Sequence, residues 1–136
     1  MTKNEYTEIG KKINEFSKLH SNWDGECGDA PSQTDINLAL EFLNLLCSQE
    51  CVIPTPMISG DGEIGLLWRN ENTGLYIDLG FLNGELSYYA CSDCTDEKFQ
   101  DIKTVTREHL NILLREIKEI LDASEGEQVN ASQSCK

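Results

Sequence analysis

Three short runs in which every second residue is apolar, separated by glycine-containing turns, constrain this chain more than any other feature of its sequence. Asn-Gly and Asp-Gly dipeptides favour tight hairpins, because the residues of such turns need positive φ angles. Alternation places the apolar side chains of a strand on one face of a sheet. The pattern therefore predicts an antiparallel meander of three strands, or of four if residues 55–59 join it. In chain order the turns and runs are Asp61-Gly62, 64–68, Asn72-Thr73-Gly74, 75–81, Asn83-Gly84 and 86–90.

The two faces of this meander differ in character. The face expected to pack on a core carries Ile64, Leu66, Trp68, Leu75, Ile77, Leu79, Phe81, Leu86, Tyr88 and Ala90. The opposite face carries Leu67, Arg69, Tyr76, Asp78, Leu82, Ser87, Tyr89 and Cys91. Aromatic anchors such as Tyr76 and Tyr89 among charged residues are typical of a protein interface. The alternative is that a helix or a second protomer covers this face.

Three helices are predicted around the meander, two before it and one after it. Residues 4–20 have apolar side chains three and four positions apart, and residues 104–121 form a similar stripe. Residues 32–50 are apolar nearly all round, which is typical of a helix at the centre of a core or buried by a partner. Ser32, with Asp35 three residues later, is the predicted N-cap of this helix.

The order of these elements predicts an α+β fold with two N-terminal helices, the three- to four-stranded meander and a C-terminal helix, the helices lying on one face of the sheet. At 136 residues the chain has the size of one domain, which we place at residues 1–121. Residues 92–103 are polar and predict no definite element. Residues 122–136 are too polar to pack, which predicts a disordered, flexible acidic tail.

The net charge of −13 belongs to the middle of the chain. Residues 21–97 contain fourteen Asp and Glu residues but only one base, Arg69. Nucleic-acid binding needs a basic footprint, so no direct nucleic-acid contact is expected. An acidic surface attracts a basic partner, although the same charge can serve solubility alone. The acidic and aromatic residues predicted to contact a partner are Asp61, Glu63, Tyr76, Asp78, Glu85, Tyr89, Asp93 and Asp96.

The hydropathy of the chain predicts no membrane partner. No apolar run approaches the ~20 residues that a membrane span needs. Residues 1–12 lack the apolar segment of a signal peptide. We therefore expect the protein in the cytoplasm, which is the host cell cytoplasm if a phage encodes it.

Six cysteines in a reducing compartment indicate free thiols or metal ligands. Two pairs, Cys47-x3-Cys51 and Cys91-x2-Cys94, could together supply four thiolates to a zinc ion. Against this, Cys47 falls in the apolar stripe of a predicted helix, where a buried thiol is ordinary. A structural or incidental role is favoured, and we expect no metal and no cofactor.

The sequence offers no catalytic motif. It has two histidines, His20 at the end of one predicted helix and His109 in the first turn of another. It contains no Gly-x-Ser-x-Gly, P-loop or dinucleotide-binding motif. The glycine-rich stretch at 60–65 opens a strand instead of a helix and carries two acids, so it would repel phosphate. We therefore expect a non-enzymatic protein.

A polar, glycine-rich loop at residues 20–32, HSNWDGECGDAPS, contains one tryptophan, Trp23. Its acids do not follow the alternating ligand positions of a calcium-binding EF-hand. The loop is either a structural corner or a binding tip. Asp24 and Gly25 favour the corner, because Asp accepts backbone hydrogen bonds in an Asx turn and Gly adopts positive φ.

This loop, with the segments NLALEFLNLL, PTPMISGDGEIGLLW, LYIDL and LSYYA that follow, resembles a family of small, mostly uncharacterised bacterial and phage proteins with an Asn-Trp-Asp-Gly loop. The resemblance covers about residues 13–90; Asp29 departs from it, since the family tends to run Gly-Ala directly. It implies an accessory protein of bacteria or mobile elements, and it offers no established activity or catalytic residue to carry over. The resemblance also supports the expectation that Trp23 packs as a hydrophobic plug between the first two helices.

Together these features predict a non-enzymatic, acidic protein-binding module that inhibits or regulates a basic, nucleic-acid-handling partner. A phage protein of this kind could block a host defence nuclease complex by occupying its DNA or RNA channel, as anti-CRISPR proteins do. The alternatives are a homo-oligomeric accessory protein, such as a homodimer built on the second helix and the aromatic sheet face, an antitoxin- or immunity-type partner, and a zinc-stabilised module.

Overall fold

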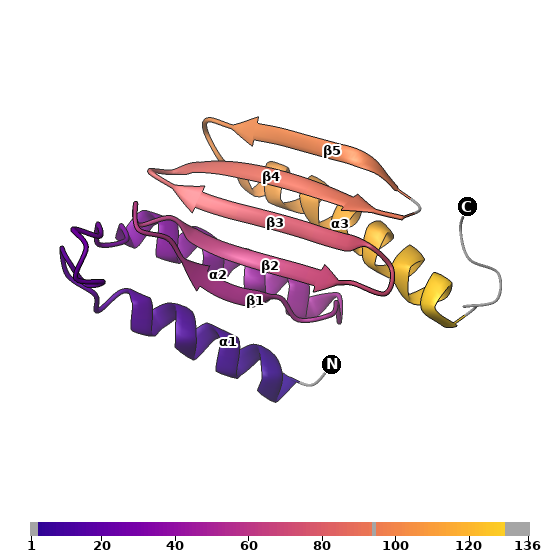
Figure 1. Cartoon of the computed structure of the whole chain (residues 1–136), viewed down its shortest axis with the longest axis horizontal. Coiled ribbons are helices and arrows are strands. Elements are labelled where there is room, and N and C mark those ends of the chain that lie inside the picture. Colours follow the sequence, from indigo (N-terminus) through magenta and orange to yellow (C-terminus); the bar gives the residue numbers. More distant parts are fainter. Residues whose placement is uncertain (1–2, 94, 130–136) are drawn as a thin grey trace.

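The computed structural model describes residues 3–93 and 95–129, and its centre is a five-stranded antiparallel sheet with strand order β1-β2-β3-β4-β5 (Figure 1). Each strand pairs with the next one along the chain. The predicted meander is therefore confirmed, with one strand more than the four that were its upper limit. The strands are β1 Thr55–Ile58, β2 Ile64–Asn70, β3 Leu75–Leu82, β4 Glu85–Ser92 and β5 Thr95–Ile102.

Strand β5 is the element that the sequence pattern did not reveal. Its sequence, TDEKFQDI, shows no alternation, because six of its eight residues are exposed and only Ile102 is buried. It lies at the edge of the sheet and pairs with β4 alone. Charged side chains are common on such edges, since they oppose pairing with another chain. Within the polar stretch at 92–103, Thr95–Ile102 is thus an edge strand held by its backbone register.

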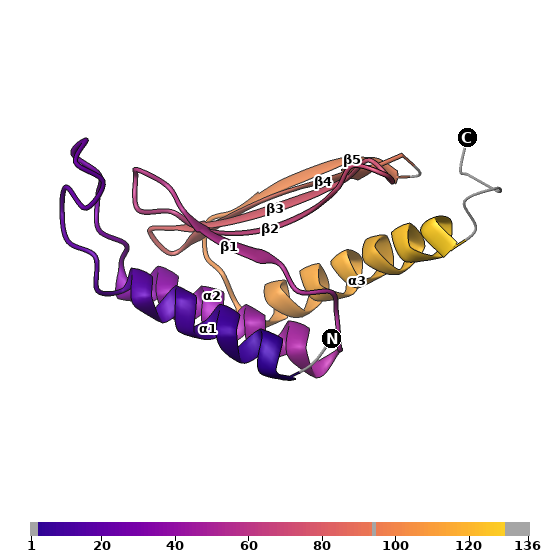
Figure 2. The ribbon, with the colours of Figure 1, turned by 60° about the horizontal axis from the view of Figure 1, so that its bottom comes forward.

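Three helices lie on one side of the sheet, which we call the covered face (Figures 1 and 2). They are α1 Lys3–Phe16, α2 Gln33–Ser48 and α3 Arg107–Val129. Helix α1 packs on α2 and β1, and α2 packs on β2 and β3. The opposite side, which we call the open face, carries no helix of the described chain. The predicted α+β layering is confirmed, and none of the described helices is long and apolar enough to cross a membrane.

Helix α1 ends at Phe16, four residues earlier than the apolar spacing predicted. Beyond it, Ser17, Lys18 and Leu19 donate their backbone N–H groups to carbonyls three residues back, each at 3.1 Å. Such tight turns are usual where a helix unwinds. They lead the chain into the loop that contains Asn22, whose φ is 65°.

The hydrophobic core fills the space between the covered face and the helices. All ten side chains predicted for the inner face of the sheet are buried, none more than 7% exposed. Of the two positions predicted for the apolar helix α2, at the centre of the core or buried by a partner, the structure shows the first, since α1 flanks it and the sheet lies above it. The helices contribute chiefly Ile13, Ile36, Phe42, Leu46, Leu110, Leu113 and Ile117 to this core.

A buried carboxylate joins the start of α2 to the turn between β3 and β4. Ser32 caps the helix as predicted, its Oγ accepting the backbone N–H of Asp35 at 3.1 Å. The Asp35 side chain, 1% exposed, accepts the backbone N–H groups of Asn83 at 2.8 Å and of Gly84 at 2.9 Å. Both turn residues have positive φ, 54° and 79°, as an Asn-Gly hairpin requires. Asp35 therefore fixes the helix against the hairpin.

Helix α3 runs to Val129, eight residues beyond its predicted end at Leu121. Ser124 is buried, and its hydroxyl donates to Thr73 Oγ1 at 2.8 Å in the turn between β2 and β3. The predicted disordered tail is therefore wrong at its start, because a buried hydrogen bond satisfies a side chain that looked too polar to pack. The rest of that predicted tail, from 130 to 136, lies outside the described residues.

Candidate functional site

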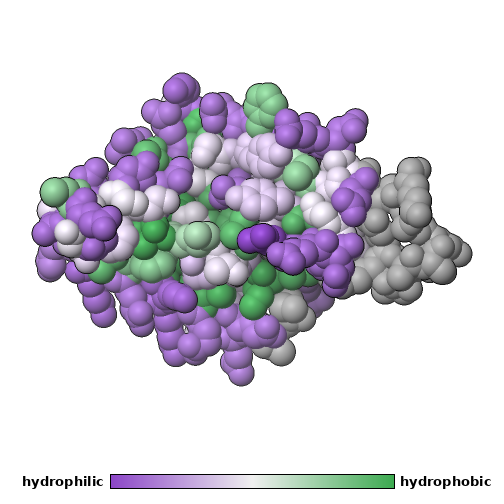
Figure 3. All heavy atoms as spheres, viewed as in Figure 1, coloured by the Kyte–Doolittle hydropathy of each residue, from purple (hydrophilic) through white to green (hydrophobic). Residues whose placement is uncertain are grey.

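The open face of the sheet carries the best candidate for a functional surface. Figure 3 shows pale and hydrophobic side chains over the middle of this face, with hydrophilic side chains around them. Strand register places one residue from each strand in a line across the sheet, and paired residues on neighbouring strands project from the same face. This line, the central row, consists of Thr55, Leu67, Asp78, Tyr89 and Phe99.

The aromatic side chains of the open face include one fixed ring and one uncovered ring. Tyr76 and Tyr89 meet edge to face, with ring centroids 5.9 Å apart and an interplanar angle of 67°. The Tyr89 hydroxyl donates to Glu97 Oε2 at 2.6 Å, and this bond raises the pKa of Tyr89. Tyr89 is thus held at both its ring and its hydroxyl. Phe99, beside it on β5, is 77% exposed.

A hollow of about 250 Å³ lies beside the central row. Gly80 of β3 and Ser87 of β4 face each other across the strands and form its floor. The carboxylate of Glu63 lies over Gly80, so close that a Cβ atom at this position would collide with it. Glycine here makes room for a carboxylate on the sheet surface. The charged residues around the hollow are Glu63, Glu85, Asp101 and Lys103.

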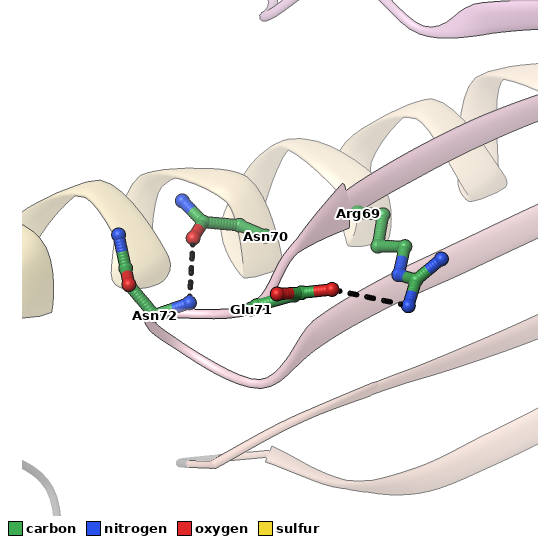
Figure 4. A network of polar contacts seen from close by, with 4 residues as sticks. All are labelled: Arg69, Asn70, Glu71 and Asn72. Carbon is green, nitrogen blue, oxygen red and sulfur yellow. Dashed lines mark hydrogen bonds and ion pairs between the residues drawn. The ribbon is translucent and has the colours of Figure 1, made fainter.

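The two bases at the open face are both engaged by carboxylates of this chain. Arg69 Nη2 lies 3.2 Å from Glu71 Oε1 at the turn between β2 and β3 (Figure 4). Lys103 Nζ lies 3.2 Å from Glu85 Oε1 near the hollow. The other carboxylates of the open face are therefore not neutralised by these bases.

Asp78 and Glu63 are two such carboxylates, and neither forms an ion pair with a described residue. Partial burial raises the pKa of Asp78. Partial burial also raises the pKa of Glu63, and the nearby charges of Asp61 and Asp78 raise it further. Partial burial and like charge both disfavour an ionised carboxylate, and the opposite charge of an incoming cation would offset both effects.

The structure brings together five of the eight residues predicted to contact a partner. These five lie on the open face: Glu63, Tyr76, Asp78, Glu85 and Tyr89. Asp61 lies in the β1–β2 loop and Asp93 in the β4–β5 turn, at opposite ends of the sheet. Asp96 lies in β5 where the register with β4 shifts between Ala90 and Ser92, so strand pairing does not place it with these five. These three aspartates were predicted from the local charge of the sequence, which does not indicate on which face of a sheet a residue lies.

Three residues of the open face were not among those predicted from the sequence to contact a partner. Phe99 and Glu97 belong to β5, which no alternation revealed, and Met57, 47% exposed, belongs to the short strand β1. A lone aromatic residue in a charged run was the one available signal for Phe99. Only the pairing of β5 with β4 places Phe99 next to Tyr89.

The loop at 20–32 is a corner closed by its own hydrogen bonds. Asp24 Oδ1 accepts the backbone N–H groups of Glu26 at 2.9 Å and of Gly28 at 2.8 Å. These bonds lower the pKa of Asp24. Gly25 follows with a φ of 75°. The predicted Asx turn with a positive-φ glycine is therefore confirmed.

Trp23 does not form the predicted plug between the first two helices. Its side chain is half-buried and outside the hydrophobic core, and its Nε1 donates to the Asp29 carbonyl at 2.7 Å. The loop turns towards the β1–β2 loop, where the Asp29 N–H donates to the Gly60 carbonyl at 2.8 Å. The indole therefore serves the loop itself, and the prediction was wrong because it assumed that an apolar ring would reach the core.

The cysteine positions give no support to a zinc site. Cys47 lies in α2, Cys51 follows that helix, and Cys91 lies in β4. Cys94 lies outside the described residues. Among the residues that are described, no three His, Cys, Asp or Glu side chains gather closely enough to hold a metal ion.

Comparisons of this chain with protein-family models, with curated proteins and with solved structures find no match. The resemblance to proteins with an Asn-Trp-Asp-Gly loop therefore stays a prediction based on sequence. The function has to be inferred from the geometry and the charge of the open face.

Proposed function

We propose that this protein is a non-enzymatic, acidic protein-binding module whose open sheet face binds a basic protein partner. One observation supports this proposal most directly. An uncovered sheet face presents the exposed Phe99 ring and the half-buried Tyr76 and Tyr89 rings beside carboxylates that pair with none of the described bases. Aromatic anchors within a charged rim are typical of protein interfaces, and complementary charge speeds and selects the encounter.

The partner's chemistry follows from the charge. Fourteen acids and one base between residues 21 and 97 create a negative field that attracts basic surfaces. Extended basic surfaces are typical of proteins that bind nucleic acids, because their lysine and arginine side chains neutralise the phosphates. The proposed action is therefore to occupy such a surface and to inhibit or regulate the protein that carries it, in the manner of a phage anti-defence protein or an immunity-type partner.

Self-assembly through the open face is the competing function, and charge disfavours it. A face-to-face dimer would add the carboxylates Glu63 and Asp78 of a second copy to this face, while Arg69 and Lys103 of each copy are already paired with Glu71 and Glu85. The sheet edges also oppose lateral pairing. Strand β1 has four residues and contains Pro56, and β5 presents a charged edge. We therefore expect a monomer by multi-angle light scattering.

The test uses two matched double variants in affinity capture from the natural host's lysate. Asp78→Asn/Phe99→Ser removes one acid and one exposed apolar side chain from the open face. Glu119→Gln/Ile112→Ser removes the same from α3, where Glu119 is exposed and Ile112 is 51% exposed. We expect wild type and the α3 variant to enrich the same basic proteins and the open-face variant to lose them.

Salt provides the second criterion of this test. Exposed charges are largely screened beyond about 8 Å at physiological ionic strength and more strongly above it. Proteins held by the open face should therefore leave wild type in roughly 0.5 M salt. Equal capture by the two double variants would refute the proposal. Recovery of only this protein itself, with a dimer mass in light scattering, would establish self-assembly instead.

A further inference from the structure

We infer that the central row of the open face recognises an arginine side chain of the basic partner, through the Tyr89 and Phe99 rings and the carboxylates of Asp78 and Glu97. This inference rests on the proposed function and goes further, because it names the residue type that the partner must present. It is carried by the order of side chains across three neighbouring strands.

The register places an acid and two rings side by side. Asp78 of β3 pairs with Tyr89 of β4, and Tyr89 pairs with Phe99 of β5. Adjacent strands lie about 4.8 Å apart, so directly paired side chains are neighbours within reach of one ligand group. A ligand above Tyr89 therefore has a carboxylate on one side and an exposed phenyl ring on the other.

The Tyr89 ring is prepared for this contact before any partner arrives. Its hydroxyl is held by Glu97 at 2.6 Å, and its ring is held by the edge-to-face contact with Tyr76. Binding therefore costs little side-chain entropy at this residue. Glu97 keeps acceptor capacity after taking one hydrogen bond, because an ionised carboxylate offers about four lone-pair sites.

Arginine fits this arrangement better than lysine does. A guanidinium group is planar, lies flat on aromatic rings and donates several hydrogen bonds in a fixed fork to carboxylates. A lysine ammonium would satisfy the charge but not the flat contact with the rings. The two bases described at the open face do not fill the position, since Arg69 pairs with Glu71 and Lys103 with Glu85.

Two fluorescent peptides of equal length and charge test the inference. Each carries three basic residues in a glycine–serine background, arginines in one and lysines in the other, and fluorescence anisotropy at low salt gives their affinities. We expect wild type to bind the arginine peptide roughly fivefold more tightly, as a cation–π contribution at a partly exposed site would give.

Two variants separate ring recognition from charge. Phe99→Leu/Tyr89→Leu keeps the net charge and apolar character but removes both rings, so the preference for arginine should fall to about one. Asp78→Asn should weaken both peptides alike. As a control, a substitution to leucine outside the open face, Ile112→Leu on α3, should change the affinity of neither peptide. Circular dichroism checks that each variant is folded.

The outcomes distinguish the inference from the proposed function. Equal affinities for the two peptides, both weakened by Asp78→Asn, would overturn arginine recognition and leave the acidic open face as a binding surface. An arginine preference that survives loss of both rings would also overturn the inference. Failure of both peptides to bind wild type would count against the proposed function as well.

Discussion

Polar side chains on the two sides of the sheet differ in the partners that they have within the chain. On the covered face, Asp35 is 1% exposed and accepts two backbone N–H groups, and Ser124 donates to Thr73. On the open face, Asp78 and Glu63 have no ion pair among the described residues although partial burial raises the pKa of both. Asp35 and Ser124 therefore stabilise the fold, whereas the carboxylates of Asp78 and Glu63 remain available to a cationic partner.

The same contrast holds for the aromatic residues. Phe81 of β3 is fully buried against the helices, while Phe99 of β5 is 77% exposed. A buried phenylalanine stabilises through the apolar area removed from water, and an exposed one contributes nothing of this kind until another molecule covers it. Substitutions of one residue type on the two faces should therefore separate stability from binding.

The largest difference is expected between the two phenylalanines. Phe81→Ala should lower the free energy of unfolding by about 4 kcal/mol, because it removes a large side chain from a packed core. Phe99→Ala should change it by less than about 0.5 kcal/mol. Urea unfolding followed by tryptophan fluorescence measures both. A loss above about 2 kcal/mol for Phe99→Ala would mean that the open face is covered in solution, by a second copy of the chain.

The two aspartates should differ by nearly as much. Asp35→Ala leaves the N–H groups of Asn83 and Gly84 buried without an acceptor, and we expect a loss of about 3 kcal/mol. Asp78→Ala should leave stability unchanged within about 0.5 kcal/mol and should weaken partner binding. Similar unfolding midpoints for the two variants would show that water replaces the Asp35 carboxylate at the hairpin.

A smaller effect is expected for the serines. Ser124→Ala removes one buried hydrogen bond to Thr73 and should cost about 1 kcal/mol. Ser87→Ala on the open face should cost less than about 0.5 kcal/mol, since the hydrogen bond of Ser87 to Glu63 lies on an exposed surface. Thermal unfolding by circular dichroism compares them. If Ser124→Ala were as stable as Ser87→Ala, the extension of α3 beyond Leu121 would contribute nothing to the fold.

The smallest effect concerns pH. The pKa values of Glu63 and Asp78 are raised above the ordinary 4.5 and 3.8, so the folded protein holds these two protons more firmly than the unfolded chain. Their contribution to stability is complete below the ordinary values and is lost as pH rises through the raised ones.

Urea unfolding at several pH values between 4 and 7 should resolve this contribution. The stability of wild type relative to Glu63→Gln/Asp78→Asn should be greater at the acidic end of this range and fall as pH rises. The comparison with the double variant cancels the other acids of the chain. A difference that does not change with pH would show that these two carboxylates are fully hydrated on the folded surface.

Local patterns in the sequence predicted much of the architecture. Alternation placed residues such as Ile77 and Tyr76 on opposite faces of a strand, and the turn dipeptide Asn83-Gly84 marked a hairpin. The N-cap at Ser32 and the Asx turn at Asp24 also followed from residues a few positions apart. These features depend on short-range geometry, which the order of residues encodes directly.

The tertiary structure alone decided the features that need distant partners. Strand β5 exists because β4 offers it a backbone register, not because its own residues alternate. The acceptor role of Asp35 joins residues 48 and 49 positions apart, and the hydrogen bond of Ser124 spans 51 positions. Likewise, the sequence determined that the chain is acidic, but only the sheet decided that Asp78, Tyr89 and Phe99 lie in one row, because strand register is set between strands and not within them.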